Sequence, residues 1–587
     1  MEVFGTGNDM RDLTILKGFL LKHKGQFIFG LITLIVSNLS ALLVPRILRD
    51  AIDGLKSGMG GDALVRYALL MVFLTIVAGV FRFLTRYRLI GASFTIAYEL
   101  RNRLFGHLQG LSASYFKKTR TGDIMARATN DLEAVRRLLG PGVLNLLNIL
   151  IMGPMAVGLM VGISPRLTLY AVLPLPFLTI SIAVVRPKIF SRFQQVQEQF
   201  SSLSAKAQEN LTGIRVIKAF AQEENEINSF RQINQGYLER NMGLVKIWGL
   251  FWPFIMFIAG LSMVVVLWFG GRQVIAGAIS LGQFVQFANY LMMITWPMMA
   301  LGWVINLLQR GSASMKRIGE ILNQAPEIKD NKGRKNIQTL KGTIEFRNVS
   351  FGYDGKQVLK EINLKIEKGM TVAIVGPTGA GKSTLVSLIP RLFDPTEGEV
   401  VIDGTDVKQI PIKALRKSIG YAPQESFLFS ESIKENIAYG LEDDDVRLVQ
   451  EAATVSNLTD DIEGFPQGYD TVVGERGVML SGGQKQRVAL ARAIARHPSI
   501  LILDDVFSSV DTYTEEEILK RLRRFMQTRT SILISHRIST VREADLIVVL
   551  KDGQIVEQGT HEQLLARGGF YANMYQQQQV LEEIARM

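Results

Sequence analysis

The sequence predicts an all-α membrane domain of six helices with long cytoplasmic helical extensions, followed by an α/β domain. Its 587 residues exceed what one hydrophobic core can organise. The composition is 48% hydrophobic with a mean hydropathy of +0.18, yet 20% of the residues are charged. The long apolar stretches all lie before residue 302, and the rest of the chain has the patterns of strands and helices. A membrane part joined to a soluble part explains these observations together.

Six stretches are long and apolar enough to cross the hydrocarbon core of a bilayer, which needs roughly 20 residues. They are Phe27–Ile47, Leu64–Leu84, Val143–Ile163, Leu167–Val185, Leu250–Phe269 and Phe284–Leu301. The connections after the second and fourth stretches are long and helical in pattern, and those after the third and fifth are short. Because the helical spacing continues beyond the spans, we expect rods that extend into the cytoplasm.

The positive charge of the chain is explained by its membrane topology. The net charge is +12, and basic residues gather in the first long connection: Arg101, Arg103, Lys117, Lys118, Arg120, Arg127, Arg136 and Arg137. Basic loops stay on the cytoplasmic side, so both long connections and both termini are expected there. The apolar segment Leu13–Leu21, flanked by lysines, is expected to lie along that membrane surface. The absence of cysteine excludes disulfides and thiolate chemistry.

These patterns divide the chain into three parts. Residues 1–324 are expected to form the transmembrane domain, with six spans and an N-terminal interfacial helix. The polar run of residues 325–340 has the composition of a linker. Residues 341–587 are expected to form the α/β domain, with strands at Gly342–Phe351, Met370–Val375 and Ile500–Leu503 and a helix at Ser383–Arg391.

A phosphate-binding loop is the most specific motif in the second half. The run GPTGAGKST fits G-x-x-x-x-G-K-[ST] and stands between a predicted strand and a predicted helix. Glycines let backbone N–H groups turn toward phosphate oxygens, Lys382 is expected to reach the β- and γ-phosphates, and Ser383 is expected to ligate Mg²⁺. The residues expected to hold the nucleotide here are Gly376, Thr378, Gly379, Ala380, Gly381, Lys382, Ser383 and Thr384.

A second element of the same site follows in the sequence. The run Ile500–Leu503 is apolar and ends in Asp504. A buried parallel strand that carries an Asp at its carboxyl end is how phosphate-loop domains supply a further Mg²⁺ contact. Ser383, Asp504 and, on the resemblance described next, Gln424 are therefore the expected metal contacts.

Between these motifs lies the run LSGGQ, and here the sequence resembles the ATP-binding cassette (ABC) family, in particular exporters that carry membrane and nucleotide domains in one chain. The resemblance covers essentially the whole chain. It implies a six-helix exporter domain with two coupling loops within residues 1–324, followed by an α/β P-loop ABC ATPase domain. In the family, this signature contacts the γ-phosphate of an ATP bound to the opposite cassette. The residues that would do so are Ser481, Gly482, Gly483 and Gln484.

Further positions match the family one by one. Tyr353 lies where the family stacks an aromatic ring on adenine, and Gln424 matches the loop that senses Mg²⁺. His536, in LISHR, matches the histidine that contacts the γ-phosphate. The run TVVGERG at residues 471–477 resembles the loop that senses the coupling helices. Catalytic roles are therefore expected for Gln424, His536 and the residue after Asp504.

That residue departs from the family pattern, because Asp505 stands where most members have Glu. The side chain is one methylene shorter, which retracts the carboxylate by roughly 1.5 Å. With an intact signature, this substitution resembles one subunit of the heterodimeric exporters, whose degenerate site hydrolyses ATP slowly or not at all. The implied partner is a second, non-identical half-transporter that carries the consensus Glu. The alternative is a homodimer in which Asp505 serves as a slow catalytic carboxylate.

The substrate is less well indicated by the sequence. Flexible and aromatic side chains in the sixth span suit apolar ligands, although they serve equally for lipid-facing or helix packing: Met292, Met293, Trp296, Met298, Met299 and Trp303. Arg82 and Arg86 near the cytoplasmic end of the second span suggest a polar cavity or simple snorkelling. Amphipathic drugs or lipids are therefore the expected substrates.

The function expected from this resemblance is ATP-driven export across the cytoplasmic (inner) membrane by alternating access. The cofactors would be ATP and Mg²⁺, and the partners would be the bilayer, the second chain and an amphipathic small molecule. Nucleic acid is not expected, since six spans exclude a soluble cassette ATPase of DNA or ribosomes. A membrane ATPase that gates rather than pumps would share all of these motifs, so that alternative stays open.

Overall fold

The computed structural model describes residues 16–330, 337, 339–442, 445–474 and 480–586. The chain divides into two compact units. The first comprises residues 1–109 and 120–324, and the second comprises residues 110–119 and 325–587. Residues 110–119 thus cluster with the second unit, although they lie within the stretch that the sequence predicts as the transmembrane domain.

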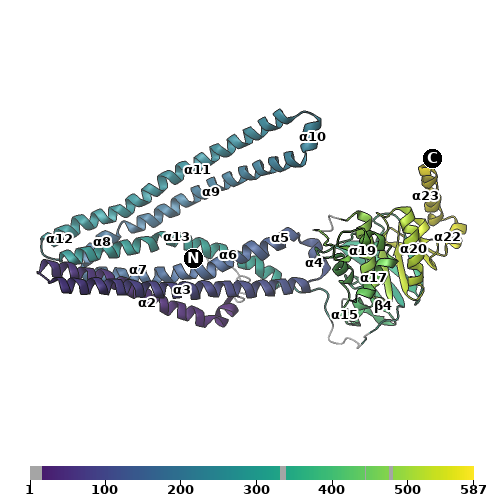
Figure 1. Ribbon diagram of the computed structural model, residues 1–587, viewed down its shortest axis with the longest axis horizontal. Helices are drawn as coiled ribbons and strands as arrows, with labels where there is room; N and C mark the ends of the chain where they lie inside the picture. Colours follow the sequence, from purple (N-terminus) through teal and green to yellow (C-terminus); the bar gives the residue numbers. More distant parts are fainter. Residues whose placement is uncertain (1–15, 331–336, 338, 443–444, 475–479, 587) are drawn as a thin grey trace. The chain divides into compact units, whose positions relative to one another are not determined.

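The first unit is entirely helical in the part that the structure describes. Its helices are α2 (Lys24–Lys56), α3 (Gly61–Gly110), α5 (Thr121–Ala126), α6 (Leu132–Arg137), α7 (Val143–Ile163), α8 (Pro165–Val172), α9 (Leu175–Thr212), α10 (Ile214–Ala219), α11 (Glu223–Val265), α12 (Gly271–Ile275) and α13 (Leu281–Leu322). Short π-helical turns connect α5 to α6, α6 to α7 and α11 to α12. Figure 1 shows α9 and α11 side by side as a long hairpin with α10 at its tip. Residues 16–22, the described part of the predicted interfacial segment, are helical.

Five helical stretches in the described residues are long and apolar enough to cross a membrane. They contain five of the six predicted spans: Lys24–Lys56, Gly61–Gly110, Thr121–Ile163, Glu223–Ile275 and Leu281–Leu322. The predicted span Leu167–Val185 is instead divided between α8 and α9 by a turn at Leu173 and Pro174. Proline cannot donate the backbone hydrogen bond that would continue α8. That this stretch crosses the bilayer therefore stays a prediction.

Polar contacts fasten the helices of this unit around an apolar core. The Tyr290 hydroxyl of α13 donates to the Leu42 carbonyl of α2 at 2.9 Å, and Asn38 of α2 donates to Asn148 of α7 at 3.0 Å. The core side chains come from α2, α7, α8 and α13, with Val266 after α11 and Ile279 before α13. Paired polar groups are the usual arrangement inside membrane helices, because an unpaired one is costly there.

The second unit is an α/β domain with two sheets. An antiparallel sheet has the order β2-β1-β4-β5, and a six-stranded sheet has the order β10-β9-β3-β8-β7-β6. The strands are β1 (Ile344–Tyr353), β2 (Lys356–Ile366), β3 (Thr371–Val375), β4 (Glu397–Ile402), β5 (Thr405–Asp406), β6 (Ile419–Ala422), β7 (Ile500–Asp504), β8 (Thr530–Ile534), β9 (Leu546–Lys551) and β10 (Gln554–Gly559). Strands β9, β3, β8, β7 and β6 run parallel, so their carboxyl ends meet at one edge.

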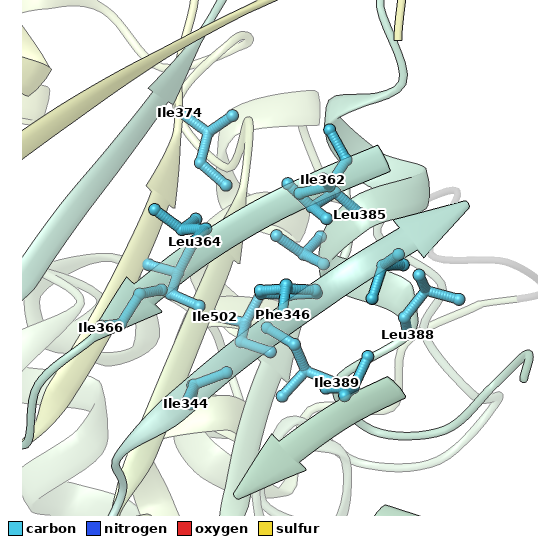
Figure 2. Close-up of a cluster of buried hydrophobic side chains, with 14 of the residues drawn as sticks. Ile344, Phe346, Ile362, Leu364, Ile366, Ile374, Leu385, Leu388, Ile389 and Ile502 are labelled. Carbon is cyan, nitrogen blue, oxygen red and sulfur yellow. The ribbon is translucent and has the colours of Figure 1, made fainter. Parts of the chain in front are cut away.

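Helices complete this unit. They are α4 (Ala113–Lys118), α14 (Lys382–Ser387), α15 (Ile412–Lys417), α16 (Ile433–Ala438), α17 (Val446–Val455), α18 (Thr459–Glu463), α19 (Gly482–Ala495), α20 (Thr512–Met526), α21 (Ile538–Val541), α22 (His561–Arg567) and α23 (Phe570–Arg586). Figure 2 shows side chains from the antiparallel sheet and from α14 and its following turn meeting Ile374 of β3 and Ile502 of β7. This core fixes the phosphate loop between β3 and α14.

The predicted strands of this unit are confirmed as β1, β3 and β7 with small shifts at their ends. The predicted helix Ser383–Arg391 is shorter, because α14 ends at Ser387 and Arg391 has a positive φ of 53°. The described residues of the predicted linker form neither helix nor strand. The predicted sensing loop at residues 471–477 lies outside the described residues from position 475 onward.

Candidate functional site

The phosphate loop has the backbone shape that its glycines allow. Gly376, Gly379 and Gly381 have φ values of +148°, +83° and +99°, a region that side chains other than glycine rarely adopt. A side chain at Gly376 would also collide with the carbonyl oxygen of Leu550. The loop begins where β3 ends at Val375 and leads directly into α14. The local sequence therefore dictates a close-fitting loop with room for phosphate oxygens.

Lys382 lies buried inside this loop with its charge only partly balanced. Its Nζ donates to the carbonyl oxygens of Gly376 at 2.8 Å and Pro377 at 2.9 Å. Burial lowers the pKa of Lys382, and the charges of Asp505 and Asp504 act in the opposite direction. An anion that replaced the two neutral carbonyls would stabilise the ammonium further. The loop therefore fits a phosphate group.

Ser383 and Asp504 meet where the prediction places a metal. The Ser383 hydroxyl donates to Oδ1 of Asp504 at 2.9 Å, and Asp504 ends the fully buried strand β7. Burial raises the pKa of Asp504, the hydrogen bond from Ser383 lowers it, and the neighbouring Asp505 charge raises it again. A buried carboxylate beside a hydroxyl is a donor pair that suits Mg²⁺ with phosphate oxygens as its other ligands.

Asp505 and Gln424 face each other across the same cavity. Gln424 Nε2 donates to Oδ2 of Asp505 at 3.4 Å, and Asp505 is buried with a positive φ of 52°. Its backbone N–H donates to the carbonyl of Ile534 at 2.9 Å, which fixes the residue after β7. The carboxylate that replaces the family's Glu therefore reaches the cavity while its backbone is held in place.

A cavity of about 190 Å³ brings most of the predicted residues together. Its lining residues are Thr378, Gly379, Gly381, Lys382, Ser383, Thr384, Gln424, Asp504, Asp505 and His536, with Val358 and Ile534. Sequence reasoning missed the last two, which are apolar and have no motif of their own. Gly376 and Ala380 belong to the same loop but do not line this cavity.

The signature residues lie apart from this cavity, at the start of α19. The Ser481 hydroxyl accepts a hydrogen bond from the Gln484 N–H at 3.2 Å, and Gln484 Oε1 accepts one from the Ser481 N–H at 2.9 Å. This reciprocal cap holds the helix start, and Ser481 and Gly482 are exposed. The signature therefore presents a capped helix start to the exterior of its own chain.

A glutamine that the sequence prediction did not single out joins this helix to the loop after Asp505. Gln486 Oε1 accepts a hydrogen bond from the Ser509 N–H at 2.9 Å, and Gln486 Nε2 donates to the Ser508 hydroxyl at 2.7 Å. A side chain at Gly483 would lie 3.0 Å from the Ser509 carbonyl oxygen. Gln486 shares a helix face with Gly482 and Gly483, and this spacing was the available signal.

Tyr353 lines a separate cavity of about 530 Å³. Its hydroxyl lies 3.5 Å from the Thr384 hydroxyl of α14, and its ring packs edge-to-face against Phe351 and Phe393 at centroid distances of 4.8 and 5.4 Å. Lys117 of α4 places its Nζ 3.8 Å from the ring centroid, and Lys118 pairs with Asp354 at 2.6 Å. A cation thus lies on the aromatic ring that is predicted to receive adenine.

The residues predicted as substrate contacts differ in exposure. Met292, Trp296 and Trp303 of α13 are exposed, whereas Met293 and Met298 pack against the core of the first unit. The side chain of Met299 lies outside the described residues. Arg82 and Arg86 of α3 are exposed. The sixth predicted span thus divides into a packing face and an exposed face.

Comparisons with known proteins agree with this architecture. Residues 27–298 match the family of the ABC transporter transmembrane region, and residues 359–508 match the ABC transporter family. A probable multidrug resistance ABC transporter ATP-binding/permease protein, YheI of Bacillus subtilis, is 38% identical over 94% of this chain and 95% of its own length. An ATP-dependent lipid A-core flippase of Syntrophus aciditrophicus is 35% identical over 96% of this chain and 94% of its own length.

The same architecture occurs in a solved structure. A bacterial Atm1-family ABC exporter with ATP bound superposes with a TM-score of 0.77 at 28% identity, covering 94% of this chain and 98% of that chain. The prediction of a helical membrane domain followed by an ABC ATPase domain is therefore confirmed. The chain belongs to the ABC transporter family, as a multi-pass membrane protein of the exporter type that binds and hydrolyses ATP in its cytoplasmic domain to drive transport.

Proposed function

We propose that this chain is one subunit of a heterodimeric exporter that uses ATP and Mg²⁺ to move amphipathic drugs or lipids out of the cytoplasmic leaflet. The multidrug and lipid A-core names of its relatives support this class of substrate. The proposal depends chiefly on one observation, which is that the shorter Asp505 stands beside Gln424 in the nucleotide cavity, where most of the family has Glu.

The chain's own loop would hold one ATP. Lys382 would bind the β- and γ-phosphates, because its ammonium is buried among weaker carbonyl acceptors. Ser383, Asp504 and Gln424 would hold Mg²⁺, which supplies charge neutralisation on the phosphates. Tyr353 would stack on the adenine. His536, which lines the same cavity, would contact the γ-phosphate.

Hydrolysis at that site would be slow. A carboxylate retracted by roughly 1.5 Å is poorly placed to accept a proton from the attacking water, and displacements near 1 Å cost on the order of 100-fold in rate. Gln424 further engages Asp505 at 3.4 Å. The exposed Ser481 cap would instead serve the ATP of the partner, whose Glu completes a fast site. Binding and hydrolysis would thus be divided between two composite sites.

With one slow and one fast ATP site, transport would proceed by alternating access. Closure of the two cassettes on ATP would be carried through the cytoplasmic helices to the membrane spans, and hydrolysis at the fast site would reset them. Two alternatives remain as outcomes of the tests. Asp505 reaches the cavity, which favours a slow homodimer as the second candidate, and a gating protein would use the same ATP site without pumping.

A transport assay tests the proposal directly. The chain is co-purified with a half-transporter that carries Glu at the corresponding position and is reconstituted with outward-facing cassettes. We expect ATP-dependent accumulation of a fluorescent amphiphile against its gradient. Movement only down the gradient would favour gating, and full transport by the chain without its partner would favour the homodimer. The Lys382→Met variant is the control for dependence on ATP.

A further inference from the structure

A cavity of about 510 Å³ lies in the first unit along the start of α2 and the middle of α3. Its lining residues are Gln26, Phe83, Arg86, Tyr87, Arg88, Ile90, Gly91, Phe94 and Thr95. This lining contains two guanidinium groups, three aromatic rings and no carboxylate. A volume of this size lies within the range of sites that hold a small organic molecule, roughly 300–1,000 Å³.

The wall of the cavity is held by contacts between α2 and α3. The Thr85 hydroxyl donates to the Thr33 hydroxyl at 2.9 Å, and the Ser37 hydroxyl donates to the Ala78 carbonyl at 2.9 Å. Leu89 is fully buried against Gly30. These contacts fix one face of α3, so Arg86, Tyr87 and the other lining residues are held on the neighbouring faces. The site is therefore built on two anchored helices rather than on a loop.

The arginines are arranged among aromatic rings. Arg88 lies with its Cζ 5.2 Å from the ring centroid of Phe29 and 5.8 Å from that of Tyr87. Phe83 stacks on Tyr87 with centroids 6.0 Å apart, and Arg136 lies 4.3 Å from the ring of Phe94. Planar guanidinium groups that stack in this way keep their N–H donors available at the edge.

The nearby carboxylates are already paired with other cations. Glu99 of α3 accepts from Lys22 at 2.8 Å and lies 3.2 Å from His23, and Glu133 accepts from Arg136 at 2.6 Å and Arg137 at 2.8 Å. In the described residues, no ion pair joins Arg86 or Arg88 to an acidic side chain. The cavity therefore keeps a positive charge that the described carboxylates do not neutralise.

The position of the cavity along α3 indicates on which side of the membrane the cavity lies. The apolar run Leu64–Leu84 ends where the lining begins, and residues 83–95 extend about 18 Å further at about 1.5 Å per residue. The basic connection that follows α3 is expected on the cytoplasmic side of the membrane, so the cavity would begin in the acyl region and continue through the headgroup level of the cytoplasmic leaflet. Phe83 and Tyr87 would face lipid chains, and the guanidinium groups would face phosphates.

We propose that this cavity binds the phosphate headgroup of an anionic amphiphile from the cytoplasmic leaflet. The hydrocarbon tail of that molecule would lie along Phe83 and Tyr87. Guanidinium groups bind phosphate in a bidentate way, and the aromatic wall offers an apolar contact that a free, fully hydrated anion would not use. This inference rests on the export function proposed above. It identifies the chemical class of substrate that the exporter would take. An amphipathic phosphate ester matches both the charge and the apolar surface of the lining.

Lipid binding to the full chain tests this proposal. The chain, alone and with its partner, is titrated in neutral detergent with phosphatidic acid and with phosphatidylcholine of the same chains, and binding is measured by native mass spectrometry. We expect at least about tenfold tighter binding of phosphatidic acid. The double substitution Arg86→Gln, Arg88→Gln should remove this preference, whereas Arg66→Gln, near the other end of α3, should keep it. Arg88→Lys retains the charge and checks that the altered helix still folds.

Three results would overturn the proposal. They are an unchanged preference in the double variant, an equal loss in Arg66→Gln, and equal competition by millimolar inorganic phosphate. Failure of the export function gives a different result, since lipid binding would still depend on Arg86 and Arg88 while no amphiphile accumulated. If the binding preference is absent but a neutral amphiphile is exported, the site fails and the export function stands.

Discussion

Two parts of the ATPase domain are proposed to bind phosphate, and they differ in how they are built. The loop around Lys382 is buried and carries its own counter-charges in Asp504 and Asp505. The start of α19 at Ser481 is exposed and satisfies its own backbone through a cap. A buried site can hold a whole nucleotide, whereas an exposed cap is incomplete until another surface closes on it. This difference suggests that the two parts serve two different ATP molecules.

Removing the buried cation should have the largest effect. We expect Lys382→Met to weaken ATP binding to this chain on the order of 100-fold, because the phosphates lose a charge-assisted partner in a dry site. Titration of the isolated chain with a fluorescent ATP analogue measures this loss. Lys368→Ala, an exposed lysine before β3, should bind as the wild type does. Similar losses in both variants would mean that the loop is not the binding site.

Removing the exposed hydroxyl should act on the other ATP. Ser481→Ala is expected to lower ATP turnover of the heterodimer by about tenfold and to leave the affinity of this chain's own loop unchanged. Ser432→Ala is the matched control, because Ser432 caps α16 through the same reciprocal pair with Glu435. If Ser481→Ala changed the affinity of this chain's own loop for ATP, the assignment of the two parts to two different ATP molecules would be wrong.

The pH dependence of stability should depend on Asp504 in the buried phosphate loop site and not on the exposed start of α19. Burial raises the pKa of this carboxyl, so the folded protein binds a proton more readily than the unfolded chain does. Stability without ligand should therefore fall as the pH rises through that raised pKa. We expect Asp504→Asn to increase the apparent Tm without Mg²⁺ at pH 7.5 by about 2 °C and to remove the effect of Mg²⁺ on ATP binding. A decrease in Tm would contradict this account of the buried charge.

The smallest effect is expected at the adenine position. Lys117 lies 3.8 Å from the Tyr353 ring centroid, so a stacked base must displace it. Loss of a cation–π contact worth about 1 kcal/mol should let Lys117→Gln bind ATP about fivefold more tightly. The exposed Lys360 provides the control substitution Lys360→Gln in the same titration. Weaker binding in Lys117→Gln would mean that this lysine contacts the nucleotide rather than competes with it.

The motifs that depend on local sequence could be predicted without the structure. The phosphate loop, the strand that ends at Asp504 and the signature at Ser481 are each set within a few residues by backbone conformation and hydrogen bonding. Their residue types and spacing are therefore visible in the chain itself. The meeting of Lys382, Gln424, Asp504, Asp505 and His536 at one cavity followed from the parallel strands that carry them.

Features that depend on distant contacts could not be predicted in this way. Lys117 contacts Tyr353, which lies 236 residues (353 minus 117) further along the sequence, and the residues around Lys117 resemble the basic surface of any cytoplasmic loop. The cavity lined by Arg86 and Arg88 needs α2 to be placed against α3. The break in the fourth predicted span was visible in Pro174 and Pro176, but hydropathy alone does not register the missing backbone donors.

The central claim is that Asp505 makes this chain's own ATP site a slow one, and ATP turnover of the heterodimer whose partner carries Gln in place of its catalytic Glu tests it most directly. We expect low turnover in the wild type, almost no change in Asp505→Asn, and an increase on the order of 100-fold in Asp505→Glu, where the carboxylate regains its reach. High turnover of this heterodimer with the wild-type chain, abolished by Asp505→Asn, would contradict the account.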